Sequence, residues 1–490
     1  MDRPVRVRFA PSPTGTPHIG NMRTALFDWL FARHSGGSFI LRIEDTDQSR
    51  EVEGAVDKIY ESLRWLGLDW DEGPDVGGDY GPYMQSQRLH LYQDAAKRLA
   101  EQGNAYYCYC SSERLAQMRA EQQERKEPPR YDRTCRDLTP QKRAEKEAEG
   151  ITPVVRFKIP FEGKTSFDDV VYGRVEFENA LLDDFVILKS DGFPTYHLAS
   201  VVDDTAMRIS HVIRGDDWLS STPKHVLLYN ALKYDPPQYA HMPLTFGKDR
   251  AKLSKRHGNA ALLDYRDMGY LPEAMVNFLV LLGWSLDDKT EIFDKDELIR
   301  LFSLDGISKT GAIFNIEKLN WFNGYYIRQL TVDQLIDRIL PNLERELPRE
   351  VIRPIDREYL GRIVPLIHER IKLLTEITDL ISFFFVDDIE HNAGDLVGKK
   401  MTAELALSAL KVSCDRLGSL ADFDHDSLED LLRPLAEELG LKTGQLFGTL
   451  RVATTGRTVA PPLFETMAVL GKEKCIKRIE MAIDMLKEAA

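Results

Sequence analysis

The sequence lacks several features that mark particular classes of protein. No run of apolar residues approaches the roughly 20 that a helix needs to span a bilayer, which argues against a membrane protein. Only 5 of the 490 residues are cysteine, an odd count that argues against a disulfide framework. The first residues have neither the apolar core of a signal peptide nor the acid-poor composition of a transit peptide. We therefore expect a cytoplasmic protein, a monomer without membrane association.

Positive charge is also in short supply. The chain has 64 Lys and Arg against 78 Asp and Glu, which gives a net charge of −14. Taken alone, this argues against a nucleic-acid binder, unless the cations gather on one face. Hydrophobic residues make up 43% of the chain, which is enough apolar material for two to four domains.

The N-terminal segment has the pattern of a strand, a helix and a second strand. Residues 5–9 alternate between apolar residues and arginine, as in a strand with one polar face. Apolar residues then recur at helical spacing over 22–30, and Ser35-Gly36-Gly37 ends that helix. Residues 39–43 are almost continuously apolar, as in a buried parallel strand. Together they predict a βαβ unit.

A second α/β stretch follows later in the chain. Residues 185–188 and 196–198 flank Ser190-Asp191-Gly192, a turn signal that predicts a hairpin. Residues 209–213 predict another strand. Ser221-Thr222-Pro223 then provides a cap, with proline near the first helical position.

Changes in pattern divide the chain into four parts. Charged helical segments, near residues 113–126 and 141–149, lie in an insertion between the two α/β stretches, and helical periodicity dominates after about residue 330. We predict a Rossmann-like parallel sheet split by an insertion, then a small linking domain, then an all-α region. The predicted bounds are 1–86 with 191–248 for the nucleotide-binding domain, 87–190 for the insertion, 249–330 for the linking domain and 331–490 for the helical region.

The loop between the first strand and its helix has the chemistry of a phosphate site. It runs from Pro11 to Asn21. A helix N-terminus presents free backbone N–H groups and the positive end of a dipole. His18 can donate to a phosphate oxygen, and Gly20 lets a flat ring approach the backbone. The alternative is a proline-rich connection with an incidental histidine, which the full strand–loop–helix context disfavours.

A second segment, Lys252-Leu253-Ser254-Lys255-Arg256, has the chemistry that pyrophosphate departure needs. Adenylate formation develops negative charge on the leaving phosphates, and two lysines can neutralise that charge in the transition state. The alternative is a solvated basic loop.

Taken together, the two segments are similar to the "HIGH" and "KMSKS" signatures of class I aminoacyl-tRNA synthetases. Five further stretches resemble the bacterial glutamyl-tRNA synthetases specifically: Ala10–Gly15, Leu41–Asp47, Asp71–Pro74, Pro194–Leu198 and Glu317–Trp321. The resemblance covers essentially the whole chain. One departure is that the first signature ends in Asn21 rather than histidine.

This resemblance implies that the chain activates L-glutamate with ATP and transfers it to the 3′ end of tRNA(Glu). Mg²⁺ should accompany ATP. Catalysis then rests on positioning and charge stabilisation rather than on a general base. The implied catalytic residues are His18, Gly20, Lys252 and Lys255. Asn21, Ser254 and Arg256 are implied to bind ATP with them.

A glutamate pocket needs two separated cations and one anion. Arg8 lies near the end of the first predicted strand and Arg214 ends the strand over 209–213, where ligands bind in open α/β sheets. Arginine can grip a carboxylate with two hydrogen bonds, and Glu44 could receive the ammonium. The alternative is that both arginines form structural ion pairs. The resemblance adds lining residues, namely Ser12, Tyr196 and Ser200, the last a departure because relatives often have asparagine there.

Three of the five cysteines are spaced like metal ligands. Cys108 and Cys110 form a Cys-x-Cys pair, and Cys135 follows after 24 residues. Some relatives carry zinc in this insertion with a histidine where Asp137 stands here. A structural zinc site of these four residues is one interpretation, and free thiols in a degenerate site are the other.

The resemblance also implies RNA contacts. The helical C-terminal region resembles an anticodon-binding part and the insertion an acceptor-arm binder. Arg370 falls near where discriminating relatives place an arginine against the third anticodon base, which predicts preference for tRNA(Glu). Three alternatives stay open: a form that also charges tRNA(Gln), a non-catalytic tRNA-binding paralogue, and a nucleotidyltransferase that uses no tRNA.

Overall fold

The computed structural model describes residues 4–251 and 261–489, which fall into two compact units. The first comprises Met1–Arg266 with Met275–Ile316, and the second Asp267–Ala274 with Glu317–Ala490. The first unit contains helices and parallel strands, whereas the part of the second unit that is described contains helices and no strand. The predicted α/β fold with an all-α C-terminal region is confirmed.

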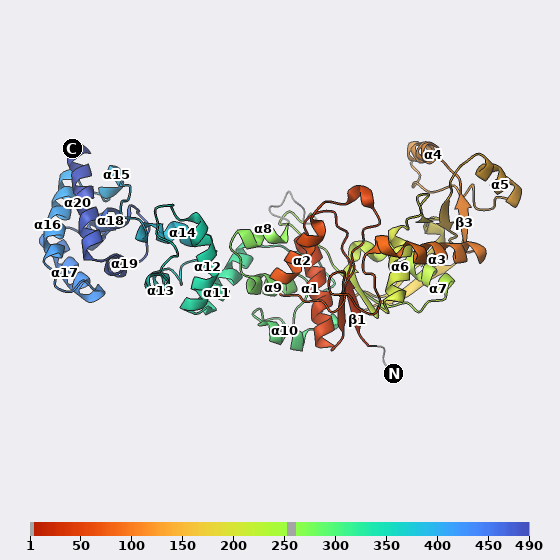
Figure 1. Cartoon of the computed structure of the whole chain (residues 1–490), viewed down its shortest axis with the longest axis horizontal. Helices are drawn as coiled ribbons and strands as arrows, with labels where there is room; N and C mark the ends of the chain where they lie inside the picture. The colour runs from red at the N-terminus through yellow and green to blue at the C-terminus, as the bar shows by residue number, and fades with distance from the viewer. Residues whose placement is uncertain (1–3, 252–260, 490) are drawn as a thin grey trace. The chain divides into compact units, whose positions relative to one another are not determined.

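The predicted βαβ unit is present at the N-terminus. Strand β1 (Arg6–Phe9) pairs in parallel with β2 (Ser38–Leu41), and α1 (Ile19–His34) connects them (Figure 1). Val7 and Phe9 are buried, as the alternation predicted. Arg8 is buried as well, with 5% of its surface exposed. The polar face of β1 is therefore turned into the protein rather than toward solvent.

A second set of parallel strands completes the sheet region. Strands β8 (His211–Gly215) and β9 (Gln238–Met242) are parallel and α7 (Thr222–Leu232) connects them. Strands β5 (Lys164–Asp169) and β6 (Gly173–Glu178) extend this sheet in the order β6-β5-β9-β8.

Hydrogen bonds between Arg6 and Ser210 join the two sets of strands. The amide of Ser210, just before β8, donates to the carbonyl oxygen of Arg6 in β1 at 2.9 Å. In return, the amide of Arg6 donates to the hydroxyl of Ser210 at 2.7 Å. The carboxyl ends of β1 and β8 therefore lie on the same side, which is where parallel sheets bind ligands.

The predicted hairpin at residues 185–198 is wrong in its second arm. Strand β7 (Val186–Leu188) and the turn are present, and the backbone amide of Lys189 donates to the carbonyl oxygen of Phe193 at 2.8 Å. Tyr196 to Leu198, however, begins helix α6 (Tyr196–Ala206). Three apolar or aromatic residues are too short a window to distinguish the two periods, and buried residues recur along α6 at helical spacing.

Residues 105–108, 154–157 and 186–188 form a separate three-stranded antiparallel sheet. The charged helices predicted near residues 113–126 and 141–149 are α4 and α5. Apart from short 3-10 helices, the other described elements before residue 316 are α2 (Ala55–Trp65), α3 (Leu89–Glu101), β3 (Ala105–Cys108), α4 (Ser112–Glu124), α5 (Pro140–Ala148), β4 (Val154–Phe157), β10 (Thr245–Phe246), α8 (Leu262–Asp267), α9 (Pro272–Leu281), α10 (Lys295–Leu301) and β11 (Ala312–Ile313).

The second unit consists of helices. Thr331 starts α12 with a capping box, in which Gln334 returns a hydrogen bond to the cap residue. The helices are α11 (Ile316–Gln329), α12 (Val332–Glu346), α13 (Arg357–Ile363), α14 (Glu376–Ile381), α15 (Ala393–Leu396), α16 (Ala403–Gly418), α17 (His425–Glu438), α18 (Thr443–Thr455), α19 (Leu463–Leu470) and α20 (Lys472–Ala489). Among all the described helices, none is long and apolar enough to cross a membrane.

Candidate active site

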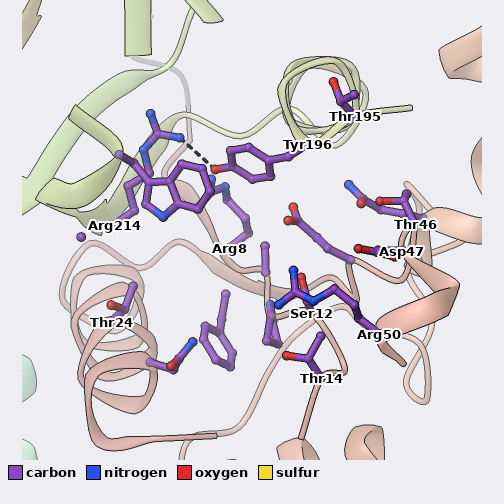
Figure 2. A pocket seen from close by; sticks show the side chains of 18 of the residues that line it. Arg8, Ser12, Thr14, Thr24, Thr46, Asp47, Arg50, Thr195, Tyr196 and Arg214 are labelled. Atoms are coloured by element: carbon purple, nitrogen blue, oxygen red, sulfur yellow. Dashed lines mark hydrogen bonds between the residues drawn. The ribbon is translucent and has the colours of Figure 1, made fainter. Parts of the chain in front are cut away.

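A cavity of about 700 Å³ lies at the carboxyl ends of β1 and β8. It gathers residues from the first loop, from the end of β2, from the start of α6 and from β8 (Figure 2). Six residues predicted from the sequence line it: Arg8, Ser12, Asn21, Glu44, Tyr196 and Arg214. Other polar lining residues are Thr14, Thr24, Thr46, Asp47, Arg50, Gln85, Lys189 and Thr195.

His18 caps the helix that begins beside this cavity. Its Nδ1 accepts hydrogen bonds from the amides of Gly20 at 3.1 Å and Asn21 at 3.4 Å. Because Nδ1 is an acceptor, the neutral imidazole carries its proton on Nε2. A Cβ at Gly20 would lie 3.1 Å from Cε1 of His18, so the imidazole packs closely against this glycine. His18 and Gly20 do not line the cavity. They form the start of helix α1, which begins beside it.

The lysine-rich segment lies outside the described residues, so the structure gives no account of Lys252, Ser254, Lys255 and Arg256. The first described residue after it is Ala261, which forms a β-bridge with His18. The next amide, of Leu262, donates to the carbonyl oxygen of Pro17 at 3.0 Å. The chain just after the second signature is therefore hydrogen-bonded to the first.

Arg8 belongs to a buried ionic cluster. Its Nε donates to Oδ1 of Asp204 at 3.1 Å, and Nη1 of Arg42 donates to the same oxygen at 2.7 Å. Nη2 of Arg42 donates to Oε1 of Glu44 at 3.1 Å. Burial opposes ionisation of Asp204, but Arg8 and Arg42 hold its pKa below the ordinary value. Burial raises the pKa of Glu44, against the pull of Arg42.

Arg214 is held in a different way, by neutral groups. Its Nε donates to Nε2 of His241 at 3.1 Å, its Nη1 to the hydroxyl of Tyr196 at 3.0 Å and its Nη2 to Oγ1 of Thr222 at 2.8 Å. The Tyr196 contact is drawn in Figure 2. Arg214 is only 5% exposed, yet no carboxylate of the described residues is within ion-pairing distance of it. A buried cation without a counter-ion is costly, so this site is built to receive an anion.

Some residues of the site were not found from the sequence, and one predicted residue is set back from the cavity. Ser200 does not line the cavity, and its hydroxyl donates to Oδ2 of Asp204 at 3.4 Å. Arg42, Asp204 and His241 were missed. A signal existed for Arg42, because a charged residue inside an apolar strand pattern indicates a buried ion pair. Asp204 and His241 gave no such signal, since nothing in the sequence indicates their partners.

The three clustered cysteines lie together in the structure. Their sulfur atoms are all within 4.8 Å of one another, with Sγ of Cys110 3.6 Å from Sγ of Cys135. The hydroxyl of Tyr131 is 3.3 Å from Sγ of Cys108 and 3.5 Å from Sγ of Cys110. Asp137 is not among them, because its exposed carboxylate faces the ammonium of Lys158 at 3.6 Å. The group therefore offers three thiols and a phenol as potential ligands.

Arg370 lies in the helical unit. It is exposed, and its Nη1 donates to the carbonyl oxygen of Ala460 at 3.5 Å. Burial and the nearby charge of Arg370 both lower the pKa of Arg451. Neither arginine has a carboxylate partner among the described residues, so positive charge gathers at this point.

Comparison with known proteins bears on the whole chain. Residues 4–321 match the family described as tRNA synthetases class I (E and Q), catalytic domain, and residues 334–483 match an anticodon binding domain. The chain is 59% identical over 488 residues to a glutamate–tRNA ligase of Dehalococcoides mccartyi, covering 100% of this chain and 99% of the relative. It is 51% identical over 493 residues to one of Roseiflexus castenholzii, covering 99% and 97%.

A solved structure also matches the whole fold of the chain. The crystal structure of a glutamate tRNA ligase from Elizabethkingia meningosepticum, in complex with its amino acid, superposes with a TM-score of 0.88 at 36% identity. The match covers 99% of this chain and 100% of that one.

The parallel sheet, the capped helix at its carboxyl edge and the two matched domains define a class I aminoacyl-tRNA synthetase. Within that class, the full-length matches place the chain in the glutamate–tRNA ligase family, as its sequence motifs indicated.

Proposed function

We propose that the chain activates L-glutamate with ATP to form glutamyl-adenylate and transfers the glutamyl group to the 3′ end of tRNA(Glu). The observation that carries the substrate assignment is Arg214. It is a buried cation without an acidic partner among the described residues, and it lines the same cavity as Arg8. Two guanidinium groups at the ends of adjacent strands fit a dicarboxylate.

The roles of the pocket residues follow from their partners. Arg8 and Arg214 bind the two carboxylates of glutamate, and the Nη atoms of Arg8 have no hydrogen-bonding partner among the described residues. Glu44, paired with Arg42, receives the ammonium. Ser12 and Tyr196 line the pocket. Glutamine would leave an arginine partly unpaired in a buried site, which discriminates by about 10⁴ in favourable cases, and aspartate is too short to reach both arginines.

ATP lies over the start of α1 in this proposal. The positive end of the α1 dipole faces the phosphates and Nε2 of His18 donates to a phosphate oxygen, with Gly20 and Asn21 beside it. Lys252 and Lys255, with Ser254 and Arg256, neutralise the charge that develops on the leaving pyrophosphate. Mg²⁺ enters as part of the ATP complex.

An aminoacylation assay tests this assignment directly. Purified tRNA(Glu) and tRNA(Gln) are each offered glutamate, glutamine and aspartate with ATP. We expect glutamylation of tRNA(Glu) and no measurable charging with the other amino acids. Charging with glutamine at a comparable rate would contradict the pocket assignment, and absence of any charging would favour a non-catalytic paralogue.

The cysteine cluster fits a structural Zn²⁺ site. The thiolates of Cys108, Cys110 and Cys135 and the oxygen of Tyr131 give four ligands, which leaves no open position for chemistry. Tyr131 thus replaces Asp137 as the fourth ligand. Metal analysis of protein purified without chelator should find about one zinc per chain, and Cys110→Ser should lower that content. A zinc content near zero in the unaltered protein would contradict the site.

Recognition of tRNA is divided among the other parts of the chain. We assign the acceptor arm to residues 87–190, stem contacts to 249–330 and the anticodon to 331–490, with 1–86 and 191–248 as the catalytic domain. The paired positive charge of Arg370 and Arg451 suits contact with an unstacked anticodon base. Arg370→Ala should reduce the preference for tRNA(Glu) over tRNA(Gln), whereas Arg433→Ala, an exposed arginine of α17, should not. Equal charging of both tRNAs by the unaltered protein would contradict this role.

A further inference from the structure

Arg214 lies at one end of a chain of hydrogen bonds that crosses three adjacent strands. In the parallel register of β8 and β9, Arg214 stands opposite His241. Strand β5 runs on the other side of β9, where Asp169 pairs in register with Tyr239. Nδ1 of His241 lies 2.6 Å from Oδ2 of Asp169, and Nε2 accepts from Nε of Arg214 at 3.1 Å. The carboxylate, the imidazole and the guanidinium therefore form a continuous line.

The chemistry of the partners fixes the proton on His241. A guanidinium N–H can only donate, so Nε2 of His241 must accept. The proton of the neutral ring is then on Nδ1, where it is donated to Asp169. Thr222 is compatible with this arrangement, since its Oγ1 accepts from Arg214 and its single proton can be donated either to Nε2 of His241 at 3.1 Å or to the carbonyl oxygen of Trp218 at 3.0 Å. Burial and the charge of Arg214 lower the pKa of His241, although the hydrogen bond to Asp169 opposes them.

Asp169 is itself held rigidly. Its side chain is fully buried. Oδ1 accepts from the backbone amides of Val171 at 2.9 Å and Tyr172 at 3.0 Å, and Oδ2 accepts from the amide of His241 at 3.2 Å. Burial alone would raise its pKa, but His241 and these amides hold the pKa below the ordinary value. The carboxylate is thus a fixed acceptor with a defined direction.

This arrangement orients Arg214 without neutralising it. An acidic residue at position 241 would form an ion pair with the guanidinium and compete with any incoming carboxylate. A neutral imidazole supplies an acceptor but no charge, and the negative charge of Asp169 stays one ring further away. We propose that Asp169 and His241 are positioning residues, which aim the Arg214 guanidinium at a substrate carboxylate. This inference rests on the proposed role of Arg214 in binding glutamate.

The first test replaces Asp169 with asparagine. The new amide would donate to Nδ1 of His241 and move the ring proton to Nε2, where it faces the donor of Arg214. In steady-state glutamylation of tRNA, we expect the KM for glutamate to rise on the order of tenfold, as for one buried hydrogen bond replaced by two opposed donors. The KM values for ATP and tRNA should stay near those of the unaltered protein. Asp168→Asn, an exposed position on the same strand, is the matched control and should change nothing.

Two variants of His241 test the same relay independently of whether Asp169→Asn folds. Glutamine at position 241 can place an oxygen near Nε2 and accept from Arg214. Asparagine retains the donor toward Asp169 but is too short to reach Arg214. We expect His241→Asn to raise the KM for glutamate on the order of tenfold and His241→Gln to recover most of that loss.

The Arg214→Ala variant distinguishes failure of the positioning role of Asp169 and His241 from failure of the glutamate-binding role of Arg214. If Arg214→Ala leaves the KM for glutamate unchanged, the glutamate pocket itself is wrong. If Arg214→Ala raises it but Asp169→Asn and His241→Asn do not, only the positioning role is wrong. Equal impairment of His241→Gln and His241→Asn would show that the packing of the ring matters rather than its acceptor atom, and would also overturn the proposal.

Discussion

The two sides of the cavity use arginine in opposite ways. On the β1 side, Arg8 shares the carboxylate of Asp204 with Arg42, and Arg42 in turn holds Glu44, so cations and anions compensate one another. On the β8 side, Arg214 is surrounded by an imidazole, a phenol and a hydroxyl. The first arginine contributes to the stability of the fold before any ligand binds. The second remains a cation whose counter-ion has to come from outside the chain.

The difference shows how one pocket can be stable without a ligand and still have an uncompensated positive charge that attracts an anionic ligand. Removing one partner of a buried ion pair leaves a charge stranded, so the β1 side resists change. Removing an uncompensated cation relieves the fold of a desolvated charge, so the β8 side can be altered with little structural cost. Replacing Arg214 should therefore reduce activity without reducing stability, whereas replacing Arg8 should reduce both.

Arg214→Ala should have the largest effect on activity. The variant loses the uncompensated cation that binds a carboxylate, and kcat/KM for glutamate should fall on the order of 10³-fold. The free energy of unfolding should be unchanged or higher. Steady-state kinetics together with denaturant unfolding check both halves, and a marked loss of stability would show that Arg214 is a structural residue after all.

Arg8→Ala should lower both kcat/KM for glutamate and the free energy of unfolding. We expect kcat/KM for glutamate to fall on the order of 10²-fold. The free energy of unfolding should also fall, by about 2 kcal/mol, because Asp204 retains Arg42 but loses its other partner. The same kinetic and unfolding measurements apply. Kinetics like those of the unaltered protein would remove Arg8 from the glutamate pocket.

Tyr196→Phe should act only through the β8 side. It removes the acceptor of Nη1 of Arg214, so the KM for glutamate should rise by about fivefold with little change in kcat. Tyr234→Phe is a suitable control, since that hydroxyl accepts from Arg98 and does not line the cavity. A KM equal to that of the control would show that Arg214 is held adequately without the phenol.

Asp28→Asn should alter stability while leaving activity in place. Asp28 of α1 is fully buried, and neither carboxylate oxygen has a hydrogen-bonding partner among the described residues. Burial raises its pKa well above the ordinary 3.8, against the pull of Arg8. Its contribution to stability is therefore present at pH values below 3.8 and is lost as pH rises toward the raised pKa.

The amide variant has no such pH dependence. Near neutral pH it should be more stable than the unaltered protein by about 1 kcal/mol or more, and the advantage should shrink as the pH falls. Thermal unfolding across that range measures it. An advantage that is constant with pH would mean that Asp28 stays ionised in the fold.

The sequence predicted the parts of the site that lie next to a recognisable pattern. Arg8 and Arg214 were found because each ends a strand, and parallel strands bind ligands at that edge. His18 and Asn21 were found because they join a strand to a helix. Tyr196 was found only through the family resemblance, and its local structure was predicted wrongly because Pro194-Thr195 marks a helix start that the short apolar window obscured.

The missed residues share a physical reason. Asp169 and His241 are 72 positions apart and meet only through the order of strands β5, β9 and β8. Asp204 is one of two adjacent acids in α6, and of its two arginines one lies in β1 and the other directly follows β2. Tyr131 has a hydroxyl that ligand spacing rules do not consider. Pairings of this kind depend on how the sheet is assembled, which no local pattern reports.

The side chains of His18 and Arg214 are held in their orientations by contacts of different range. Arg214 needs a relay across three strands to hold its direction, whereas the His18 ring is set by amides two and three residues further along its own backbone. The imidazole therefore both caps α1 and presents Nε2 beyond it, so fraying of the first helical turn would also change the direction of Nε2.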